Sequence, residues 1–202
     1  MDARDSYHSL MLTIRERFDA IQSLYALSAS FSQAEAAAFH GRKIVEAIAF
    51  GCLVAIENGL KHIPRDAKGQ WNAEEIFKSL KSKNLAILPS PSRLRPATLQ
   101  EQQENNVQVT IEGIPERRLS HDDLIGIYRA LHAWLHEVNP YVNKDHESFH
   151  AEKSAALWGD LERLRLFVEC HFISIQGEAF YCTLWDSQDN KTKVGSLTKN
   201  TA

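Results

Sequence analysis

The feature of this sequence that most constrains its fold is an apolar segment, residues 44–56, which reads IVEAIAFGCLVAI. It lies within a predicted helix from residue 32 to about residue 62, which Ser32 and Glu35 begin as a capping box and Pro64 ends. A helix that is apolar nearly all round must be covered on every side. The sequence therefore predicts a helical domain packed around this segment. The run is shorter than the roughly 20 apolar residues of a membrane span, so we expect no membrane insertion.

Four other stretches have the hydrophobic spacing and the end signals of helices. The first keeps apolar residues at alternating spacings of four and three, as the seam of a bundle helix does. The last has the same spacing and carries His171 on its seam, where we expect a buried histidine with hydrogen-bond partners. These predicted helices cover residues 5–30, 72–83, 120–140 and 148–175.

Three stretches do not have a helical pattern. Residues 107–111, VQVTI, alternate strictly and predict a strand. Near the C-terminus, AFYCTLW and KTKVGSLT flank the turn-forming DSQDN, so residues 178–199 predict a β-hairpin that the 107–111 strand can join. The proline-rich segment 88–96, LPSPSRLRP, is incompatible with a helix, and we expect a surface crossing or a hinge.

The predicted fold class is mainly α. We expect one domain over residues 1–202, an antiparallel bundle of about five helices, with the hairpin or a small sheet as an appendage. A chain of 202 residues is long enough for one well-packed core, and a hydrophobic content of 44% argues against global disorder.

Charge and cysteine usage narrow the function classes. A net charge of −3 argues against nucleic-acid binding through bulk charge, although it leaves room for a local basic patch. Cys52, Cys170 and Cys182 form no CxxC pair and lie in apolar contexts, which indicates free thiols in a reducing compartment. The first residues lack the charged-then-apolar pattern of a signal peptide, so we predict a cytoplasmic protein.

The histidines do not predict a metal site. His132/His136 and His146/His150 are spaced to place two imidazoles on one helix face. A zincin helix needs Glu directly after its first His, and Ala133 stands there instead. Neither pair has an evident third ligand. We therefore expect no metal and no cofactor, and the sequence has no phosphate-binding loop and no GxSxG elbow either.

The 120–140 helix carries the residues with the clearest chemistry. Arg129 and His136 are seven positions apart and fall on the face opposite the apolar one, with Asp122 and His132 beside them. Arginine can bind a phosphate with two hydrogen bonds, and imidazole can exchange a proton near neutral pH. These two groups suffice for cleavage of RNA by its own 2′-hydroxyl without a metal.

This arrangement resembles the HEPN family (higher eukaryotes and prokaryotes nucleotide-binding domains). In that family a helical bundle carries an Arg, four to six further residues, and then a His. The matching motif is Arg129-(x6)-His136, and the helix FHGRKIVEAIAFGCLVAIE also looks like that of uncharacterised bacterial members. The helix layout is similar over roughly residues 5–175.

The resemblance implies one HEPN-like domain that acts as a metal-independent endoribonuclease of the toxin or anti-phage defence type. Catalytic members of the family dimerise so that two motifs meet in a cleft. Carried over to this chain, the motif makes Arg129 and His136 the catalytic residues. His132 and Asp122 flank them on the same helix, and we take His132 as a further catalytic candidate and Asp122 as a binding candidate. The implied partners are a second copy of the chain, RNA, and a protein partner such as an antitoxin.

Two other interpretations remain open. The family usually has a polar residue after the Arg, and Ala130 occupies that position. This favours the alternative of a non-catalytic HEPN-like module that binds a protein or a nucleotide. The histidines and the arginine can also be simply the solvated side of a core helix. A second match, Arg165-(x5)-His171, places its members on different sides of their predicted helix and is therefore set aside.

Further candidate binding residues lie outside this helix. Arg42 and Glu46 are spaced for an ion pair, which is the usual state of an acid inside an apolar helix. Arg93 and Arg95 belong to the stretch 78–95, which has Lys and Arg but no Asp or Glu. That stretch is either a phosphate-binding patch or a solvated face.

Overall fold

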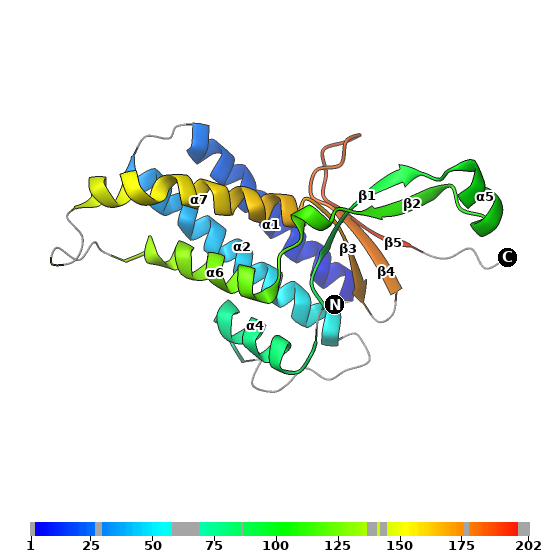
Figure 1. Ribbon diagram of the computed structural model, residues 1–202, viewed down its shortest axis with the longest axis horizontal. Coiled ribbons are helices and arrows are strands. Elements are labelled where there is room, and N and C mark those ends of the chain that lie inside the picture. The colour runs from blue at the N-terminus through cyan, green and yellow to red at the C-terminus, as the bar shows by residue number, and fades with distance from the viewer. Residues whose placement is uncertain are drawn as a thin grey trace.

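The protein is described by a computed structural model that covers residues 3–26, 30–57, 69–85, 87–136, 141, 145–175 and 178–197. It is mainly helical and contains one antiparallel sheet (Figure 1). The helices are α1 (Ala3–Ala26), α2 (Phe31–Glu57), α4 (Ala73–Ser82), α5 (Leu99–Asn105), α6 (His121–Ala133) and α7 (His146–Val168). The strands are β1 (Ser90–Pro96), β2 (Val109–Gly113), β3 (Cys170–Ile175), β4 (Glu178–Thr183) and β5 (Lys193–Leu197), and a short 3-10 turn spans Pro115–Arg117.

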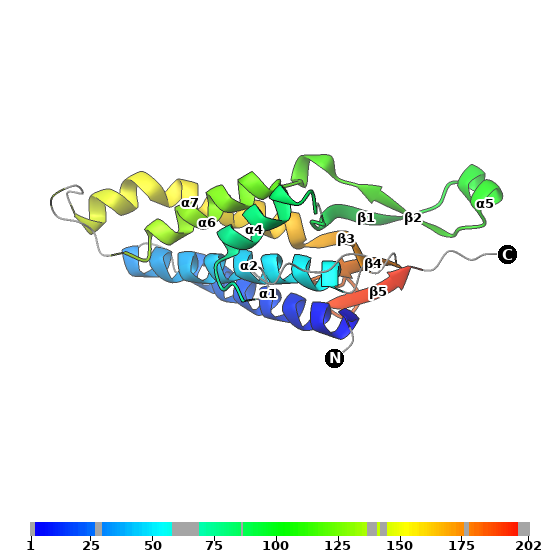
Figure 2. The same cartoon turned by 90° about the horizontal axis from the view of Figure 1, so that it is seen from below.

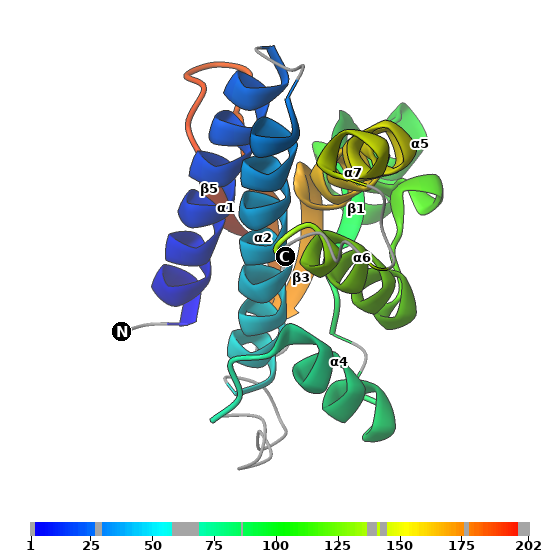
Figure 3. The same cartoon turned by 90° about the vertical axis from the view of Figure 1, so that its left-hand side faces the viewer.

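Helix α2 is the central helix, as its sequence predicts. It contacts α1, α4, α6, α7 and β3. Figure 3 shows α1 on one side of α2, with α6 and α7 on the other. Residues 44, 45, 48, 52 and 56 of α2 are at most 1% exposed, because neighbours surround this apolar segment. The predicted continuation of the helix to residue 62 lies outside the described residues.

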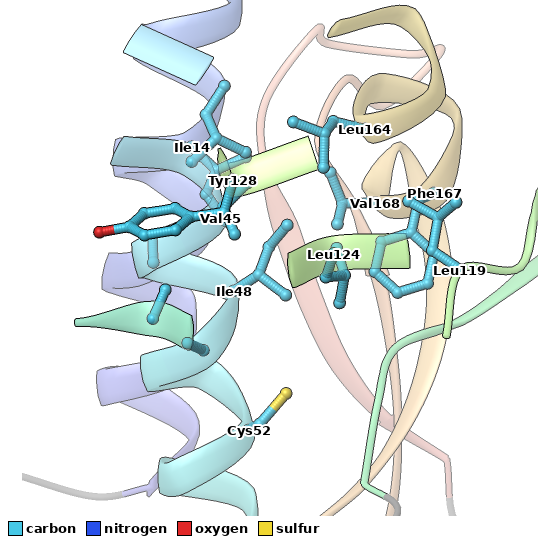
Figure 4. Close-up of a cluster of buried hydrophobic side chains, with 14 of the residues drawn as sticks. Ile14, Val45, Ile48, Cys52, Leu119, Leu124, Tyr128, Leu164, Phe167 and Val168 are labelled. Carbon is cyan, nitrogen blue, oxygen red and sulfur yellow. The ribbon is translucent and has the colours of Figure 1, made fainter. Parts of the chain in front are cut away.

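The predicted apolar seams are also buried. Tyr7, Met11, Ile14 and Phe18 of α1 are at most 4% exposed. Figure 4 shows side chains of α2, α6 and α7 meeting in one cluster, with Ile48, Leu124, Phe167 and Val168 among its members. Within the described ranges, no helix combines the length and the apolar character needed to cross a bilayer.

The sheet is larger than the predicted hairpin. Its strand order is β2-β1-β3-β4-β5, and all the pairings are antiparallel. The predicted hairpin is present as β4 and β5, and the predicted 107–111 strand is β2, shifted by two residues. The coarse prediction, a mainly helical protein with a small β part, is confirmed. The finer prediction, an antiparallel bundle of about five helices with an appended hairpin, is not confirmed, since the described residues form six α-helices and a five-stranded sheet.

The proline-rich segment is a strand and not a loop or hinge. Ser90 and Pro91 of β1 pair with β3, and Ser92 to Pro96 pair with β2. Strands β1 and β2 therefore leave the main sheet as a two-stranded arm, with α5 at its tip (Figures 1 and 2). Helix α5 has a capping box formed by Thr98 and Glu101, the first residue of the polar run EQQENN, and this helix was not predicted from the sequence.

The predicted helix 148–175 ends earlier, at Val168, and residues 170–175 form β3. His171 is nevertheless buried and satisfied, as predicted. Its Nδ1 lies 2.9 Å from the Val168 carbonyl oxygen, and its Nε2 lies 2.7 Å from the Tyr7 hydroxyl. Because Nδ1 must donate to the carbonyl, Nε2 accepts from Tyr7. Burial lowers the pKa of His171 to about 4, so the ring is neutral at pH 7.

The N-terminal turns of α1 pack against the end of the sheet. Arg4 Nε donates to the Val194 carbonyl oxygen of β5 at 3.1 Å. His8 Nε2 lies 3.2 Å from the carbonyl oxygen of Thr192, one residue before that strand. These contacts bring the beginning of the chain to its last described strand.

Candidate functional site

A polar network joins the central helix to α6. Arg42 of α2 donates from Nε and Nη2 to the hydroxyl of Tyr128, at 3.1 and 2.9 Å. Its guanidinium carbon also lies 5.0 Å from the centre of the Tyr128 ring. Figure 4 shows the Tyr128 hydroxyl directed away from the other labelled side chains of the buried cluster. The ring of Tyr128 thus belongs to the core, and its hydroxyl belongs to the network.

Glu46 is the buried acid of this network, with 8% of its surface exposed. Its carboxylate lies 3.3 Å from Arg42 Nε and 2.7 Å from Lys43 Nζ. It also accepts a hydrogen bond from the Tyr128 hydroxyl at 3.3 Å. The predicted pairing of Arg42 with Glu46 is confirmed, and it offsets the cost of burying the carboxylate.

Two histidines extend the network toward solvent. Arg42 Nη1 lies 2.9 Å from His132 Nδ1, and His132 Nε2 lies 3.0 Å from His136 Nε2. Arginine can only donate, so Nδ1 of His132 accepts and its proton resides on Nε2. That Nε2 then donates to His136. The contacts therefore run in one direction, from Arg42 through His132 to the exposed His136.

The charge state of His132 follows from its surroundings. Burial of the ring, and then the positive charge of Arg42 and the neighbouring His136, lower the pKa of His132 below its ordinary value. His132 is therefore neutral at pH 7, as the hydrogen bond from Arg42 requires.

Arg129 and Asp122, the outer residues of the predicted stripe, contact α4 instead. Arg129 donates from Nε to Glu74 at 3.0 Å and from Nη2 to the other carboxylate oxygen at 2.5 Å. Lys81 Nζ binds Asp122 at 2.5 Å. Hydrogen bonds from Arg129 and Lys78 lower the pKa of Glu74 to about 2. The two members of the predicted Arg129/His136 pair thus have different partners, and α6 itself ends at Ala133, before His136.

The two arginines of the predicted basic patch, Arg93 and Arg95, form ion pairs with acidic residues of β2 and α5. Arg93 Nε binds Glu112 across β1 and β2 at 2.7 Å. Arg95 donates to both carboxylate oxygens of Glu101 in α5, at 2.8 and 2.7 Å. Both arginines thereby stabilise the β1–β2 arm. This arrangement supports a structural role for them and not a free phosphate-binding surface.

The second predicted histidine pair, His146 and His150, lies in aromatic surroundings. The ring of His146 lies 4.4 Å from that of Phe31, and the ring of His150 lies 6.2 Å from that of Trp134. The second motif match is divided, since Arg165 is in α7 and His171 is in β3. Among the described residues, no three His, Cys, Asp or Glu side chains are grouped closely enough to hold a metal ion.

Sequence reasoning missed the role of Tyr128, which it assigned to the apolar face alone. It also treated the Arg42/Glu46 pair and the α6 histidines as separate features. One signal links them, because Tyr128 and His132 are four residues apart and so lie on the same side of α6. The side of α2 that carries Arg42 and Glu46 faces them.

Searches against protein-family models, curated proteins and solved structures found no match to this chain. The resemblance to HEPN domains therefore stays a prediction, carried by the motif and the helix layout.

Proposed function

We propose that this protein is a metal-independent endoribonuclease in which His136 exchanges protons, His132 positions His136, and Arg42 provides the positive charge. The observation that carries the proposal is the directed chain of contacts from Arg42 to His132 to His136. It combines a fixed cation on α2, a neutral imidazole in the last turn of α6 and an exposed imidazole three residues after the end of α6. These are the groups that RNA cleavage by the 2′-hydroxyl needs.

In this mechanism a ribose 2′-hydroxyl replaces His132 as the donor to His136 Nε2. The oxygen attacks phosphorus as its proton passes to that nitrogen, and the 5′-oxygen leaves to give a cyclic phosphate. The leaving oxygen takes a proton from a protonated imidazole, which His136 of a second copy would supply. Arg42 stabilises the charge on the phosphorane oxygens.

The second copy is proposed to dock along α6. Gly126, Ala130 and Ala133 are exposed beside the histidines, and small side chains let two helices approach closely. Light scattering on the wild type and on Ala133→Glu tests this step. If the wild type is a dimer and Ala133→Glu is a monomer, the result supports a cleft between two copies. If the wild type is a monomer, no such cleft forms and this step is wrong.

The proposal as a whole is tested by RNA cleavage in the presence of a chelator. His136→Ala should lower the cleavage rate by about 100-fold or more, the usual contribution of a general base. His40→Ala is the matched control, because His40 is also a partly exposed histidine on the bundle but contacts Arg17 instead. Equal rates for His136→Ala and the wild type would refute the mechanism.

A non-catalytic interaction module is the second candidate. It is favoured by the contacts of Arg129 with Glu74 and of Asp122 with Lys81, because these side chains are already used to hold α4 against α6. In that case the α6 surface binds a partner without any reaction. The wild type then cleaves no RNA, and its partner affinity is unchanged in His136→Ala.

A further inference from the structure

A separate cavity of about 580 Å³ lies between the C-terminal halves of α1 and α7, and Trp185, two residues after β4, also lines it. Its walls include the aromatic side chains of Phe18, Tyr25, Trp158 and Trp185. Helices α1 and α7 stand on either side of α2 (Figure 3), and Leu161 of α7 closes part of the wall. None of these residues belongs to the network of Arg42 and the α6 histidines.

The aromatic walls are held in fixed arrangements. The rings of Tyr25 and Trp158 meet edge to face with their centres 5.0 Å apart. The rings of Phe18 and Trp185 are 6.0 Å apart. Trp185 Nε1 donates to Asp19 at 3.2 Å, which fixes the orientation of its indole. Large aromatic surfaces that are already positioned favour the binding of another flat ring.

The polar side of the cavity carries charges that compensate one another. Arg165 binds both oxygens of Glu162, at 2.8 and 2.7 Å, and also binds Glu169 at 2.8 Å. Glu169 accepts a further hydrogen bond from Arg117 at 3.1 Å. Arg165 therefore has no unpaired charge to offer an anion, and the two carboxylates have none to offer a cation.

Hydrogen-bonding capacity remains on this polar side. A carboxylate accepts about four hydrogen bonds, and Arg165 uses only part of the capacity of Glu162. The Glu162 side chain is 52% exposed and lies at the mouth of the cavity. Gln22 on the opposite helix can donate and accept. The free positions thus suit a ligand with N–H donors at its edge.

We propose that this cavity binds an uncharged, planar heteroaromatic molecule that stacks on its aromatic walls and donates an N–H hydrogen bond to Glu162. The aromatic walls select a flat conjugated ring, and the balanced ion pairs disfavour a charged ligand. The volume lies within the roughly 300–1,000 Å³ of small-molecule sites. This binding site is independent of the proposed ribonuclease activity.

The first test compares three probes with one ring system: benzimidazole, the 1,3-dimethylbenzimidazolium cation and the benzimidazole-5-carboxylate anion. Calorimetric titration at about pH 8, where benzimidazole is neutral, measures the affinity of each. We expect benzimidazole to bind with a Kd of about 1 mM or below, and each charged probe to bind at least about tenfold more weakly. Failure of benzimidazole to bind, or tighter binding of either charged probe, would overturn the proposal.

The second test locates the site. Trp158→Ala should weaken benzimidazole binding by about tenfold or more, since stacking on the ring is lost. Tyr25→Ala changes a side chain that is 59% exposed, so it leaves the fold intact and should also weaken binding. Trp71→Ala is the control, because Trp71 is 85% exposed and lies outside the cavity. Binding that is unchanged in Tyr25→Ala and Trp158→Ala would place the ligand elsewhere and refute the assignment.

Discussion

Arg42 Nη1 donates a hydrogen bond to Nδ1 of His132 across 2.9 Å, so a residue of the central helix determines which nitrogen of an α6 histidine carries the proton. The same guanidinium binds Tyr128 and Glu46, which hold it in position. Arg42 therefore links the core of the protein to the exposed His136, and its removal should be detectable at His132.

The pKa of His132 is the most direct measure of this link. It is lowered by burial of the ring and then by Arg42 and His136. Arg42→Gln removes the positive charge, so we expect the pKa of His132 to rise. Titration of the histidine ring resonances by NMR measures it. Arg17→Gln is the matched control, since it should raise the pKa of His40, which burial and Arg17 lower, and leave His132 unchanged.

The hydrogen bond from Tyr7 to His171 should contribute measurably to stability. Tyr7→Phe leaves the buried Nε2 of His171 without a donor, which costs about 1–3 kcal/mol. Tyr25→Phe removes a hydroxyl from the same helix at a position that is 59% exposed, and we expect a change within about 0.5 kcal/mol. Urea unfolding of the three proteins gives the comparison. Equal losses in both variants would contradict a special role for Tyr7.

Buried His171 should also make the protein less stable in mild acid. Its pKa is about 4 in the folded state, against about 6.5 when unfolded, so the unfolded chain binds more protons between these values. Stability is then lost as the pH falls from about 6.5 toward 4, by about 3 kcal/mol from this residue.

NMR titration of His171 separates its contribution to the pH dependence of stability from the contributions of the other histidines. Its ring resonances should stay constant above about pH 5, because the folded pKa is about 4. A midpoint near the ordinary value for histidine would show that the folded state accepts the proton without cost.

Gly41 should not tolerate a side chain. A Cβ at this position would overlap with Leu161 Cδ2 and lie 3.2 Å from Leu131 Cδ1, where α2 packs against α7 and α6. We expect Gly41→Ala to destabilise the protein by about 1–3 kcal/mol through overpacking. Gly159→Ala in α7 is the matched control, since nothing lies within 4 Å of its Cβ and alanine stabilises an exposed helix by up to about 1 kcal/mol. Thermal unfolding distinguishes the two signs.

Glu74→Gln tests whether Arg129 takes part in RNA cleavage. Glu74→Gln removes the negative charge of the carboxylate that binds Arg129. Glu75→Gln, one residue further along α4, is the control. Because the proposed mechanism uses Arg42, we expect the cleavage rate of both variants to equal that of the wild type. A faster Glu74→Gln protein would mean that Arg129, once released, binds the phosphate.

The sequence was sufficient to predict the elements whose periodicity is unambiguous. The central α2, the seam of α1 and the caps of α4 and α6 follow from apolar spacing and from Asn72 and Ser120. The end of α7 was mispredicted because residues 168, 171 and 175 fit a helical spacing, whereas His171, Ile173 and Ile175 are buried at the alternate positions of a strand. His171 and Ile175 fit both the helical spacing and the strand spacing, so these two positions do not distinguish a helix from a strand.

Strand β1 was mispredicted for a different reason. Proline lacks the N–H of a sheet ladder, so Pro91 and Pro96 argue against a strand. Pro91 lies where β1 changes partner from β3 to β2, and Pro96 is the last residue of the strand. Of the candidate site, the Arg42/Glu46 pair is local and was predictable. The contact of Arg42 with His132 joins helices far apart in sequence, and the capture of Arg129 by Glu74 depends on where α4 packs.

The contacts between α1 and β5 have a consequence for self-association. An open sheet can extend by adding strands of other molecules at its two borders. At the β5 border, Arg4 and His8 of α1 already occupy the carbonyl oxygens of Val194 and Thr192. The N-terminal turns of α1 thus disfavour the addition of a strand from another molecule beside β5. Loss of these two side chains would leave the protein able to aggregate through β5.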